Sequence, residues 1–504
     1  MKLWGVWNIP ACILLSLFLQ VFLVLFASLR QRSRNSFLRF LICLAYLSAD
    51  WVAAVTIGLI TKFLTDPCHS RGKEDLYTFW VSFLLLHLGG PDSITSFAIE
   101  DNELWRRHFF GLILRVVGAA YYFFLILANS KLWLPTILVF VVGTVKYAER
   151  TLALYLASTD HFGAIALPKK SRAGEVVNNN PNTESVVDDD MELLMISYDL
   201  FGKFKGLIAG YSLAFEQIVK SIEYFQRMPY LEMGFKLIEN ELSFLYEVFH
   251  TKVCVVGSRI GLIIRLSSFC FIVGAFIGFH FVIVDNYKNH EFGAFEMSVT
   301  YALLIGAVGL DIISGIRLIF SDWIVASNYY GFKRYWREYI PRCFRKRSKW
   351  CGSVPRYNII DYFLDESWIL NTKLPGWLRR VVDNIKGMLF SSSEDANEHL
   401  KRFIFDELKA ASFQTHGTDE DRRNYLSSEQ ESAVVKARDH VNYTLQFTFD
   451  VVSLHLATEI CYQLTEFEYA DERKESNNCK VISDYMCYLL IMKPAMLAPV
   501  AMKD

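Results

Sequence analysis

The chain has 504 residues, a net charge of -1, 53% hydrophobic residues and a mean hydropathy of +0.23. Apolar residues gather in patches between long polar stretches, a pattern that predicts membrane spans joined to soluble regions. The near-zero net charge gives no indication of nucleic-acid binding. The ten cysteines include no CxxC pair, so neither a zinc ribbon nor a thioredoxin-like site is indicated.

Seven stretches are candidates for membrane-spanning helices, which need about 20 mainly apolar residues. They are Ile9–Leu29, Leu41–Ile60, Tyr77–Leu88, Phe109–Ala128, Leu132–Val145, Ile260–Val284 and Ser298–Phe320, of which Tyr77–Leu88 is the shortest. Lys and Arg concentrate in the segments that would be cytoplasmic if the N-terminus lay outside and the C-terminus inside. We therefore predict an all-α, polytopic helical membrane protein with about seven spans, in the plasma membrane or an endomembrane.

The chain outside the spans is predicted to be mainly helical and cytosolic. The whole chain divides into six predicted segments. These are 1–160 with five spans, 161–190 as a disordered linker, 191–258 as amphipathic cytosolic helices, 259–327 with two spans, 328–390 as a basic juxtamembrane region, and 391–504 as a helical tail. In the tail, Ser391–Asn397 is predicted to be a polar linker that caps the next helix. Phe449, Val452, Leu456 and Ile460 share one face of a later predicted helix.

The loop after the third predicted span carries a dense set of turn-forming and charged residues. Pro91 lacks an N–H group and ends a helix, Asp92 can cap the next turn of the chain, and Glu103 and Arg107 have i, i+4 spacing. One interpretation is an ordered loop that binds a ligand or partner, and the other is a structural turn between two spans. The candidate residues are Gly89, Gly90, Pro91, Asp92, Glu100, Asp101, Glu103, Trp105, Arg106 and Arg107.

Four charged residues fall inside predicted spans: Asp50, Arg115, Arg265 and Asp311. A charge near mid-depth costs roughly 2.5–3.5 kcal/mol on insertion scales. The two arginines can extend toward the membrane surface, whereas Asp50 and Asp311 are expected to face the bundle interior. There they either line a transport path or form buried pairs that fix helix packing.

A basic cluster follows the last predicted span, with aromatic residues between its members. Its lipid-contact candidates are Lys333, Arg334, Arg337, Arg342, Arg345, Lys346 and Arg347. Basic residues beside a span are attracted to anionic lipid head groups. The alternative is that they only fix the orientation of the span.

No motif indicates catalysis. GxSxG, a dinucleotide-binding glycine pattern and a kinase set are missing from the sequence. His455 and Glu459, with i, i+4 spacing, are a weak pattern for a metal, and core packing with a polar pair on the helix surface is the preferred interpretation. We therefore expect neither an enzyme nor a cofactor.

Three sequence strings carry a family resemblance: Asp50 to Gly58 (DWVAAVTIG), Leu84 to His108, and Val145 to Leu154 (VKYAERTLAL). They resemble the plant multi-pass membrane family called domain of unknown function 4220. The tail, including the run from His455 to Cys461, is similar to its C-terminal companion, domain of unknown function 594. The resemblance implies membrane architecture and a plant lineage but no activity.

Two classes of function remain at this point. The first is a membrane-anchored cytosolic interaction or scaffold protein, whose partners are the bilayer, anionic lipids and a cytosolic protein. The alternative is a transporter or channel that uses Asp50 and Asp311. The first is preferred because the predicted cytosolic segments are large and the spans hold few deep charges.

Overall fold

A computed structural model describes residues 2–65, 74–126, 130–162, 190–206, 222, 225–226, 228, 230–286, 293–327, 349–364, 391–414, 440–465 and 470–493. The chain divides into two compact units. The bundle unit comprises Met1–Asn179, Leu194–Phe201 and Asn240–Lys349, and the tail unit comprises Asn180–Leu193, Gly202–Glu239 and Trp350–Asp504. Helices make up almost all of the described structure, so the predicted all-α class is confirmed.

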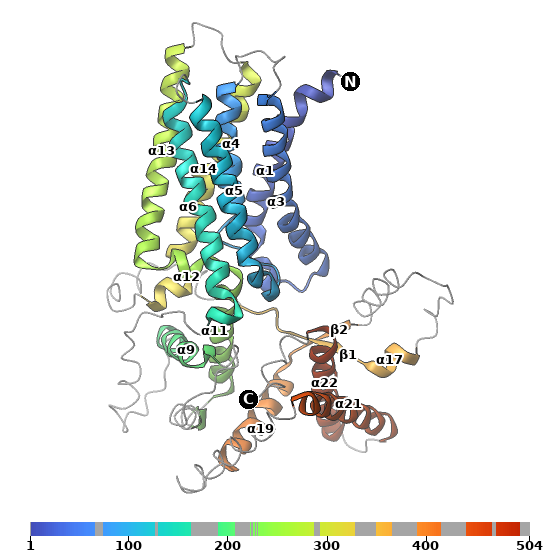
Figure 1. Cartoon of the computed structure of the whole chain (residues 1–504). Coiled ribbons are helices and arrows are strands. Elements are labelled where there is room, and N and C mark those ends of the chain that lie inside the picture. The colour runs from blue at the N-terminus through green and yellow to red at the C-terminus, as the bar shows by residue number, and fades with distance from the viewer. Residues whose placement is uncertain are drawn as a thin grey trace. The chain divides into compact units, whose positions relative to one another are not determined.

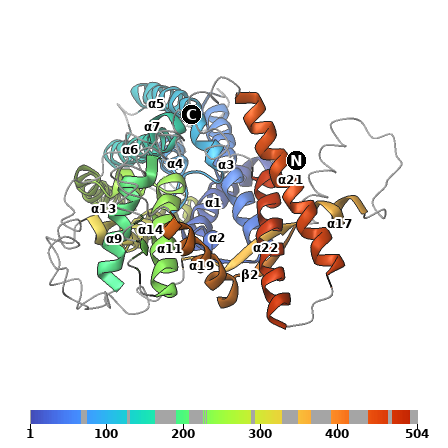
Figure 2. The same cartoon turned by 90° about the horizontal axis from the view of Figure 1, so that it is seen from below.

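Long helices run side by side in the bundle unit (Figures 1 and 2). They are α1 (Lys2–Phe26), α3 (Ser36–Thr65), α4 (Glu74–Leu88), α5 (Trp105–Ile126), α6 (Trp133–Ala157), α13 (Arg259–Asn286) and α14 (Ala294–Ile319). Short helices join them: α2 (Leu29–Arg32), η2 (Ile99–Leu104), α7 (Thr159–Phe162) and α12 (Val253–Val256).

Four described helical segments are long and apolar enough to cross a membrane, which indicates a membrane protein. They are Asn8–Phe26, Ser36–Leu64, Arg259–Ile283 and Ala294–Ile319. The finer prediction of about seven spans is not confirmed by length and composition. The helix over the third predicted span, α4, has only 15 residues, and α6 carries Lys146, Glu149 and Arg150.

The short helix α4 lies in the core of the bundle. Phe79, Trp80, Phe83 and Leu84 are fully buried, as expected for a helix that is apolar on all sides. The indole Nε1–H of Trp80 donates to Thr300 Oγ1 of α14 at 2.9 Å, so its polar atom is satisfied. Because α4 is surrounded by helices, its side chains face protein.

Part of the predicted amphipathic region, 191–258, also packs in the bundle unit. It contains α9 (Asp190–Phe204) and α11 (Leu231–His250), and residues 207–221 lie outside the described structure. Tyr198 and Phe201 of α9 pack against Phe244 of α11, and all three rings contact Trp323. These rings form a small aromatic core within the same unit.

The tail unit combines helices with one short sheet. Its elements are β1 (Ser353–Tyr357), α17 (Ile359–Leu364), β2 (Ser391–Asp395), α19 (Glu398–Gln414), α21 (His440–Leu464) and α22 (Ala470–Met492). β1 and β2 pair antiparallel, with Ser353 opposite Asp395 and Tyr357 opposite Ser391. Figure 2 shows α21 and α22 side by side.

The prediction that Ser391–Asn397 is a linker was wrong for its first part, because Ser391–Asp395 is strand β2. Serine has little intrinsic strand preference, and this strand forms only because β1 offers a partner. The capping part of the prediction is confirmed. Asn397 Oδ1 accepts the N–H of Leu400 in the first turn of α19 at 2.8 Å.

The two faces of α21 are reversed relative to the sequence prediction. His455 and Glu459, predicted as a polar pair on the helix surface, are buried, and Val451 lies one turn before them on the same face. The predicted apolar face is open instead: Phe449 is 71% exposed and Ile460 is 53% exposed. Polar groups of α22 meet this buried face: Ser483 contacts His455, and Lys480 pairs with Glu459.

Candidate functional site

The glycine-rich turn after α4 is built into the bundle. Gly90 has φ of +66°, in the left-handed region that glycine adopts without strain. Its N–H donates to the carbonyl oxygen of His87 at 2.9 Å, which closes the end of the helix. A Cβ atom on Gly89 would lie 2.9 Å from Lys146 Cβ of α6. Both glycines are thus needed for geometry. Beyond Pro91, the carbonyl oxygen of Asp92 accepts the backbone N–H of Lys252 at 3.2 Å.

The carboxylate of Asp92, the next residue, contacts two cationic side chains from segments that are distant in the sequence. Its Oδ2 accepts from Arg265 Nη2 of α13, and its Oδ1 lies 3.7 Å from Lys252 Nζ. Burial alone would raise the pKa of the Asp92 carboxyl, but Arg265 and Lys252 outweigh burial and hold that pKa well below its usual range. Asp92 is therefore a fixed anion that joins the turn to α12 and α13.

Asp311 of α14 lies at a second junction of charges. Its side chain is 1% exposed, and its Oδ1 accepts from Lys146 Nζ at 2.5 Å. The same oxygen lies 3.7 Å from Arg265 Nε. Arg265 thus lies between two carboxylates, Asp92 and Asp311, and links α13 to α14 and to the turn.

Asp50 of α3 meets a third buried cation. Arg150 Nη1 of α6 donates to Asp50 Oδ1 at 2.6 Å and to the carbonyl oxygen of Leu88 at 3.0 Å. The Arg150 side chain is 4% exposed, whereas that of Asp50 is 35% exposed. Arg150 is therefore the arginine partner of Asp50, one of the two aspartates that fall within predicted spans.

Lys252 completes the group that we call the bundle charge cluster: Asp50, Asp92, Asp311, Lys146, Arg150, Lys252 and Arg265. The Lys252 ammonium is fully buried. It donates to the carbonyl oxygens of Gly90 at 3.0 Å and Lys146 at 3.3 Å. Burial lowers the pKa of Lys252 to about 8 despite the opposing effect of Asp92.

Arg115, the fourth predicted intramembrane charge, lies apart from this cluster. Its Nη1 donates to the hydroxyl oxygen of Tyr147 at 2.6 Å. Sequence reasoning missed Lys146, Arg150 and Lys252 as cluster members. All three were assigned to cytosolic segments, although Lys146 and Arg150 belong to the string VKYAERTLAL that was part of the family resemblance.

Three other residues of the predicted loop set, Asp101, Glu103 and Trp105, fix local structure. Asp101 Oδ2 accepts the N–H groups of Phe97 at 2.8 Å and Ala98 at 2.9 Å. Glu103 Oε1 accepts from the backbone N–H and the hydroxyl of Thr159, at 2.8 and 2.7 Å. Trp105 packs edge-on against Tyr155. Glu100, Arg106 and Arg107 lie at the exposed surface of this end of the bundle.

The predicted lipid-contact cluster, Lys333 to Arg347, lies outside the described residues. The next lysine, Lys349, is described. Its Nζ donates to Asn240 Oδ1 at 2.7 Å and lies 2.8 Å from Asp322 Oδ2. Nearby Glu247 is partly buried, and burial raises the pKa of its carboxyl to about 8, with Asp322 adding repulsion.

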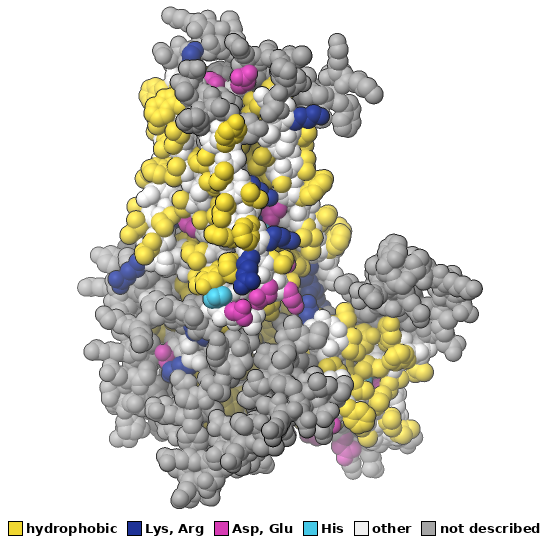
Figure 3. Space-filling model, in the orientation of Figure 1, with side chains coloured by type: hydrophobic (Ala, Val, Ile, Leu, Met, Phe, Trp, Pro, Cys, Tyr) yellow, Lys and Arg dark blue, Asp and Glu magenta, His cyan; other side chains and the backbone are white. Residues whose placement is uncertain are grey.

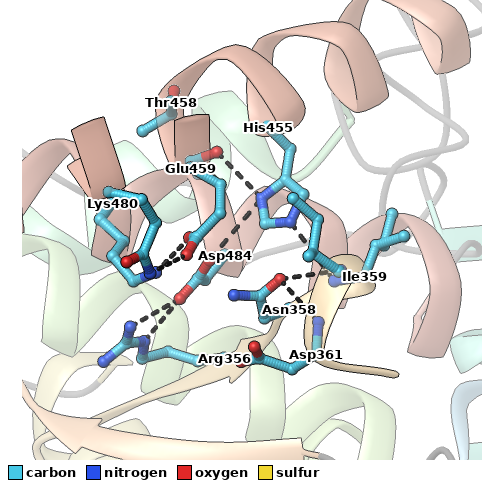
Figure 4. Close-up of polar contacts among 12 residues, drawn as sticks. Arg356, Asn358, Ile359, Asp361, His455, Thr458, Glu459, Lys480 and Asp484 are labelled. Atoms are coloured by element: carbon cyan, nitrogen blue, oxygen red, sulfur yellow. Dashed lines mark hydrogen bonds and ion pairs between the residues drawn. The ribbon is translucent and has the colours of Figure 1, made fainter. Parts of the chain in front are cut away.

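A second polar cluster lies within the tail unit (Figure 4). Arg356 Nε of β1 donates to Asp484 Oδ2 of α22 at 2.9 Å, and Arg356 also pairs with Glu394 of β2. Lys480 of α22 pairs with Glu459 of α21. We call Arg356, Glu394, His455, Glu459, Lys480 and Asp484 the tail polar cluster.

The hydrogen bonds of His455 define its tautomer. Its Nε2 accepts the N–H of Ile359 at 3.3 Å. Its Nδ1 lies 3.2 Å from Ser483 Oγ and 3.6 Å from Asp484 Oδ1. In a nucleophilic triad the hydroxyl and the carboxylate lie on opposite ring nitrogens. Here the Ser483 hydroxyl and the Asp484 carboxylate both lie on the Nδ1 side of His455. The arrangement is therefore structural, and it holds α17 against α21 and α22.

Neither cluster has the composition of a metal site. Among the described residues, no group of three or more His, Cys, Asp or Glu side chains is placed to hold a metal ion. The carboxylates of the bundle charge cluster are each opposed by Lys or Arg, whose positive charge competes with a cation. What the bundle cluster does chemically is hold four helices and one loop in register.

One family model, described as Domain of unknown function (DUF4220), matches residues 43–363. The match includes the bundle charge cluster and ends within the first helix of the tail unit after β1. No curated protein and no solved structure matches the chain. The likeness of the tail to domain of unknown function 594 and the plant lineage stay predictions.

Proposed function

The chain belongs to the family of Domain of unknown function (DUF4220), and we propose that it is a membrane-anchored interaction protein. In this proposal the bundle unit anchors the protein in the bilayer and the tail unit recruits a cytosolic protein partner. The observation that carries the proposal is the open apolar face of α21.

The open face of α21 is nearly free of charge. Its exposed apolar side chains are Phe449, Leu454, Leu456, Ile460 and Leu464, with exposed fractions of 71%, 64%, 38%, 53% and 78%. Asp450 is the exposed charged side chain among them. Figure 3 shows hydrophobic side chains gathered over this part of the tail unit. Contiguous exposed apolar surface of this kind marks interaction sites in soluble units.

The chemistry of this face favours an amphipathic helix as the partner element. Leu456, Ile460 and Leu464 recur every four residues along α21, which matches the anchor spacing of helix pairs. Because Asp450 is the exposed charge on the described part of this face, affinity would come mainly from apolar burial, at about 25 cal/mol per Å². The partner would therefore present a leucine-rich or phenylalanine-rich stripe.

The bundle charge cluster supports an anchoring role for the spans. Asp311 is closed off from solvent and opposed by Lys146 and Arg265, so its carboxylate is committed to packing. A carboxylate that binds and releases a solute or proton needs an open path. This paired arrangement therefore favours helix registration as the role of Asp311.

We further propose that α4, α5 and α6 complete a seven-span bundle with the N-terminus outside and the C-terminus inside. The three helices lie alongside the four apolar ones (Figure 1), and the short α4 is shielded from lipid by its neighbours. Tags at the two termini of the full chain, probed on intact and permeabilised cells, test this topology. A C-terminal tag that is accessible on intact cells contradicts it.

Proximity labelling and cross-linking from the full-length protein test the interaction proposal. The variant Leu454→Ser with Ile460→Ser removes two exposed anchors. Its matched control, Leu408→Ser, changes a 52% exposed leucine of α19 in the same unit. We expect a partner that is lost with the α21 variant and kept with the control. Equal capture by both variants contradicts the proposal.

A transporter or channel is the second candidate, and the half-open side chain of Asp50 favours it. Its side chain is 35% exposed although it pairs with buried Arg150. The discriminating measurement is solute flux in vesicles that contain the full chain. A flux that Asp50→Asn removes while the protein stays folded would favour transport over the anchor.

A further inference from the structure

Glu247, in the last turn of α11, is an acid with an unsatisfied carboxyl oxygen. Its Oε2 atom is inaccessible to solvent and has no hydrogen-bond partner among the residues that the structure describes. The next two residues, Val248 and Phe249, are buried. An ionised carboxylate is costly in such a place, whereas the protonated form loses much less on burial. The geometry therefore favours a protonated Glu247 while this end of α11 stays packed.

A lysine and a second acid act on this carboxyl group. Lys349 Nζ donates to Asn240 Oδ1 at 2.7 Å and lies 2.8 Å from Asp322 Oδ2. Lys349 attracts an ionised Glu247, whereas Asp322 repels it. Because Lys349 already has Asp322 as its counterion, ionisation of Glu247 adds a negative charge that no further described cation balances.

Lys349 has a particular place in the chain. It is the last residue of the bundle unit, and the tail unit resumes at Trp350. Its ammonium nitrogen also lies 5.9 Å from the centre of the Phe244 ring of α11. Phe244 in turn packs edge-on against Trp323, the residue after Asp322. These contacts hold the chain at the point where it leaves the bundle unit.

We propose that Glu247 is a proton-operated latch for this connection. While its carboxyl group is neutral, the end of α11 stays packed and Lys349 stays bound to Asp322 and Asn240. When Glu247 loses its proton, the new charge is stabilised by leaving the packed site for water. The end of α11 then opens and Lys349 is released. The latch lies apart from the α21 face, so it does not depend on the interaction proposal.

The direction of the pH dependence follows from burial. In the packed state burial raises the pKa of Glu247 from 4.5 to about 8, an effect that Asp322 increases and Lys349 opposes. In the open state the carboxyl group is hydrated and has its ordinary pKa. Opening therefore becomes more favourable as the pH rises above 4.5, by up to about tenfold per pH unit, and levels off near pH 8.

Hydrogen exchange of the amides from Phe244 to His250 tests the latch. It is measured on the full-length protein in detergent from about pH 6 to about pH 9 and corrected for intrinsic rates. Glu247→Gln keeps the shape of the neutral acid and should lose the rise in opening up to pH 8. The matched control is Glu241→Gln in the same helix, where burial raises the pKa of Glu241 only to about 7, so the rise between about pH 7 and 8 should remain. An unchanged rise in Glu247→Gln overturns the proposal.

Acetylation of the Lys349 amine by a succinimidyl ester, located by mass spectrometry, measures the release of Lys349. Its rate is taken relative to that of Lys474, an exposed lysine of α22. This ratio should rise up to pH 8 in the native chain and in Glu241→Gln, and it should stay constant in Glu247→Gln. If α11 opens in the native chain while the ratio does not change, then Glu247 does not control Lys349 and the latch is refuted.

Two further variants separate electrostatic control from a general loss of packing, and they keep the test decisive if Glu247→Gln does not fold. Lys349→Gln removes the cation that favours ionised Glu247, so the pH at which opening levels off should move up. Asp322→Asn removes the repulsion, so that pH should move down. Opposite shifts of this kind support the latch, and shifts in one direction or no shift overturn it.

Discussion

Arg265 and Asp92 are 173 residues apart in the sequence and form an ion pair within the bundle unit. The pair joins α13 to the turn that follows α4. Since Lys252 also contacts Asp92, the turn is held from two sides. The loop string Gly89-Gly90-Pro91-Asp92 is thus part of the structural framework of the bundle unit. Asp92 attaches this loop to Lys252 and to Arg265 of α13.

Replacing Asp311 by Asn should strongly destabilise the bundle unit. The change leaves Lys146 and Arg265 buried without their shared carboxylate. Removing one partner of a buried pair costs about 3–5 kcal/mol. Thermal unfolding of the full chain in detergent measures the loss.

The control for this prediction is Glu398→Gln. Glu398 forms an exposed i, i+4 pair with Arg402 in α19, and such pairs contribute at most about 0.5 kcal/mol. Similar unfolding temperatures for Asp311→Asn and Glu398→Gln would show that the bundle charge cluster contributes little to stability.

Gly143→Ala should separate α4 from α6. An added Cβ would lie 2.9 Å from the backbone nitrogen of Leu86, and backbone atoms of α4 cannot move aside. Overpacking of this kind costs about 1–3 kcal/mol. Gly118→Ala in α5 is the matched control, since its Cβ would have no atom within 4 Å and alanine is the better helix former. A Gly143→Ala variant as stable as Gly118→Ala would contradict the close contact.

The sequence predicted helix positions well because apolar runs of about 20 residues have few alternatives. It also predicted that Asp50 and Asp311 face the bundle interior, either in a transport path or in buried pairs. It could not identify their partners, since Lys146, Arg150 and Lys252 are brought to the carboxylates only by tertiary packing. Their positions near predicted span ends made them resemble cytosolic charges.

The tail was less predictable for a related reason. Strand β2 (Ser391–Asp395) has a sequence typical of a loop and becomes a strand only through pairing with β1. Helix α21 has apolar residues on most sides, so periodicity could not choose its buried face. The choice follows from the contacts of His455 with Ser483 and of Glu459 with Lys480, both of which lie on α22.

Because one face of α21 is exposed and the other is buried, truncating a side chain on each face should change the stability of the tail unit by different amounts. Val451→Ala removes a buried side chain and should destabilise the tail unit by about 1–2 kcal/mol. Leu454→Ala removes a 64% exposed side chain and should change stability by less than about 0.5 kcal/mol. Hydrogen exchange of α22 amides in the full chain reports both. A large effect of Leu454→Ala would show that the face is already covered.

The tail polar cluster should weaken as the pH falls below 6.5. Burial lowers the pKa of His455 from 6.5 in the folded protein. As the pH falls below 6.5, the unfolded chain therefore protonates this histidine before the folded chain does. The stability that neutral His455 contributes to the tail unit above pH 6.5 is lost on acidification. Protonation would also remove the acceptor for Ile359 N–H. The facing charges are Asp484 and Lys480 of α22, Glu459 of α21, Asp361 of α17, and Arg356 and Glu394 of the sheet.

Two carboxyl groups of the tail polar cluster, those of Glu459 and Asp484, affect the stability of the tail unit at lower pH and in opposite directions. Hydrogen bonds from Gln463 and Lys480 outweigh burial and lower the pKa of Glu459 from 4.5, so its contribution is lost as the pH falls through that lower value. Burial raises the pKa of Asp484 from 3.8, so its protonation favours the folded state on acidification. The earliest loss, just below pH 6.5, therefore belongs to His455.

Hydrogen exchange of the α21 and α22 amides, followed across this pH range and corrected for intrinsic rates, measures that loss. His455→Gln should flatten the pH dependence just below 6.5, because glutamine can still accept from Ile359 but does not titrate. His399→Gln, at an exposed position of α19, should leave the dependence unchanged. If native protein and His455→Gln show the same slope, then His455 does not link α17 to the two tail helices as its hydrogen bonds indicate.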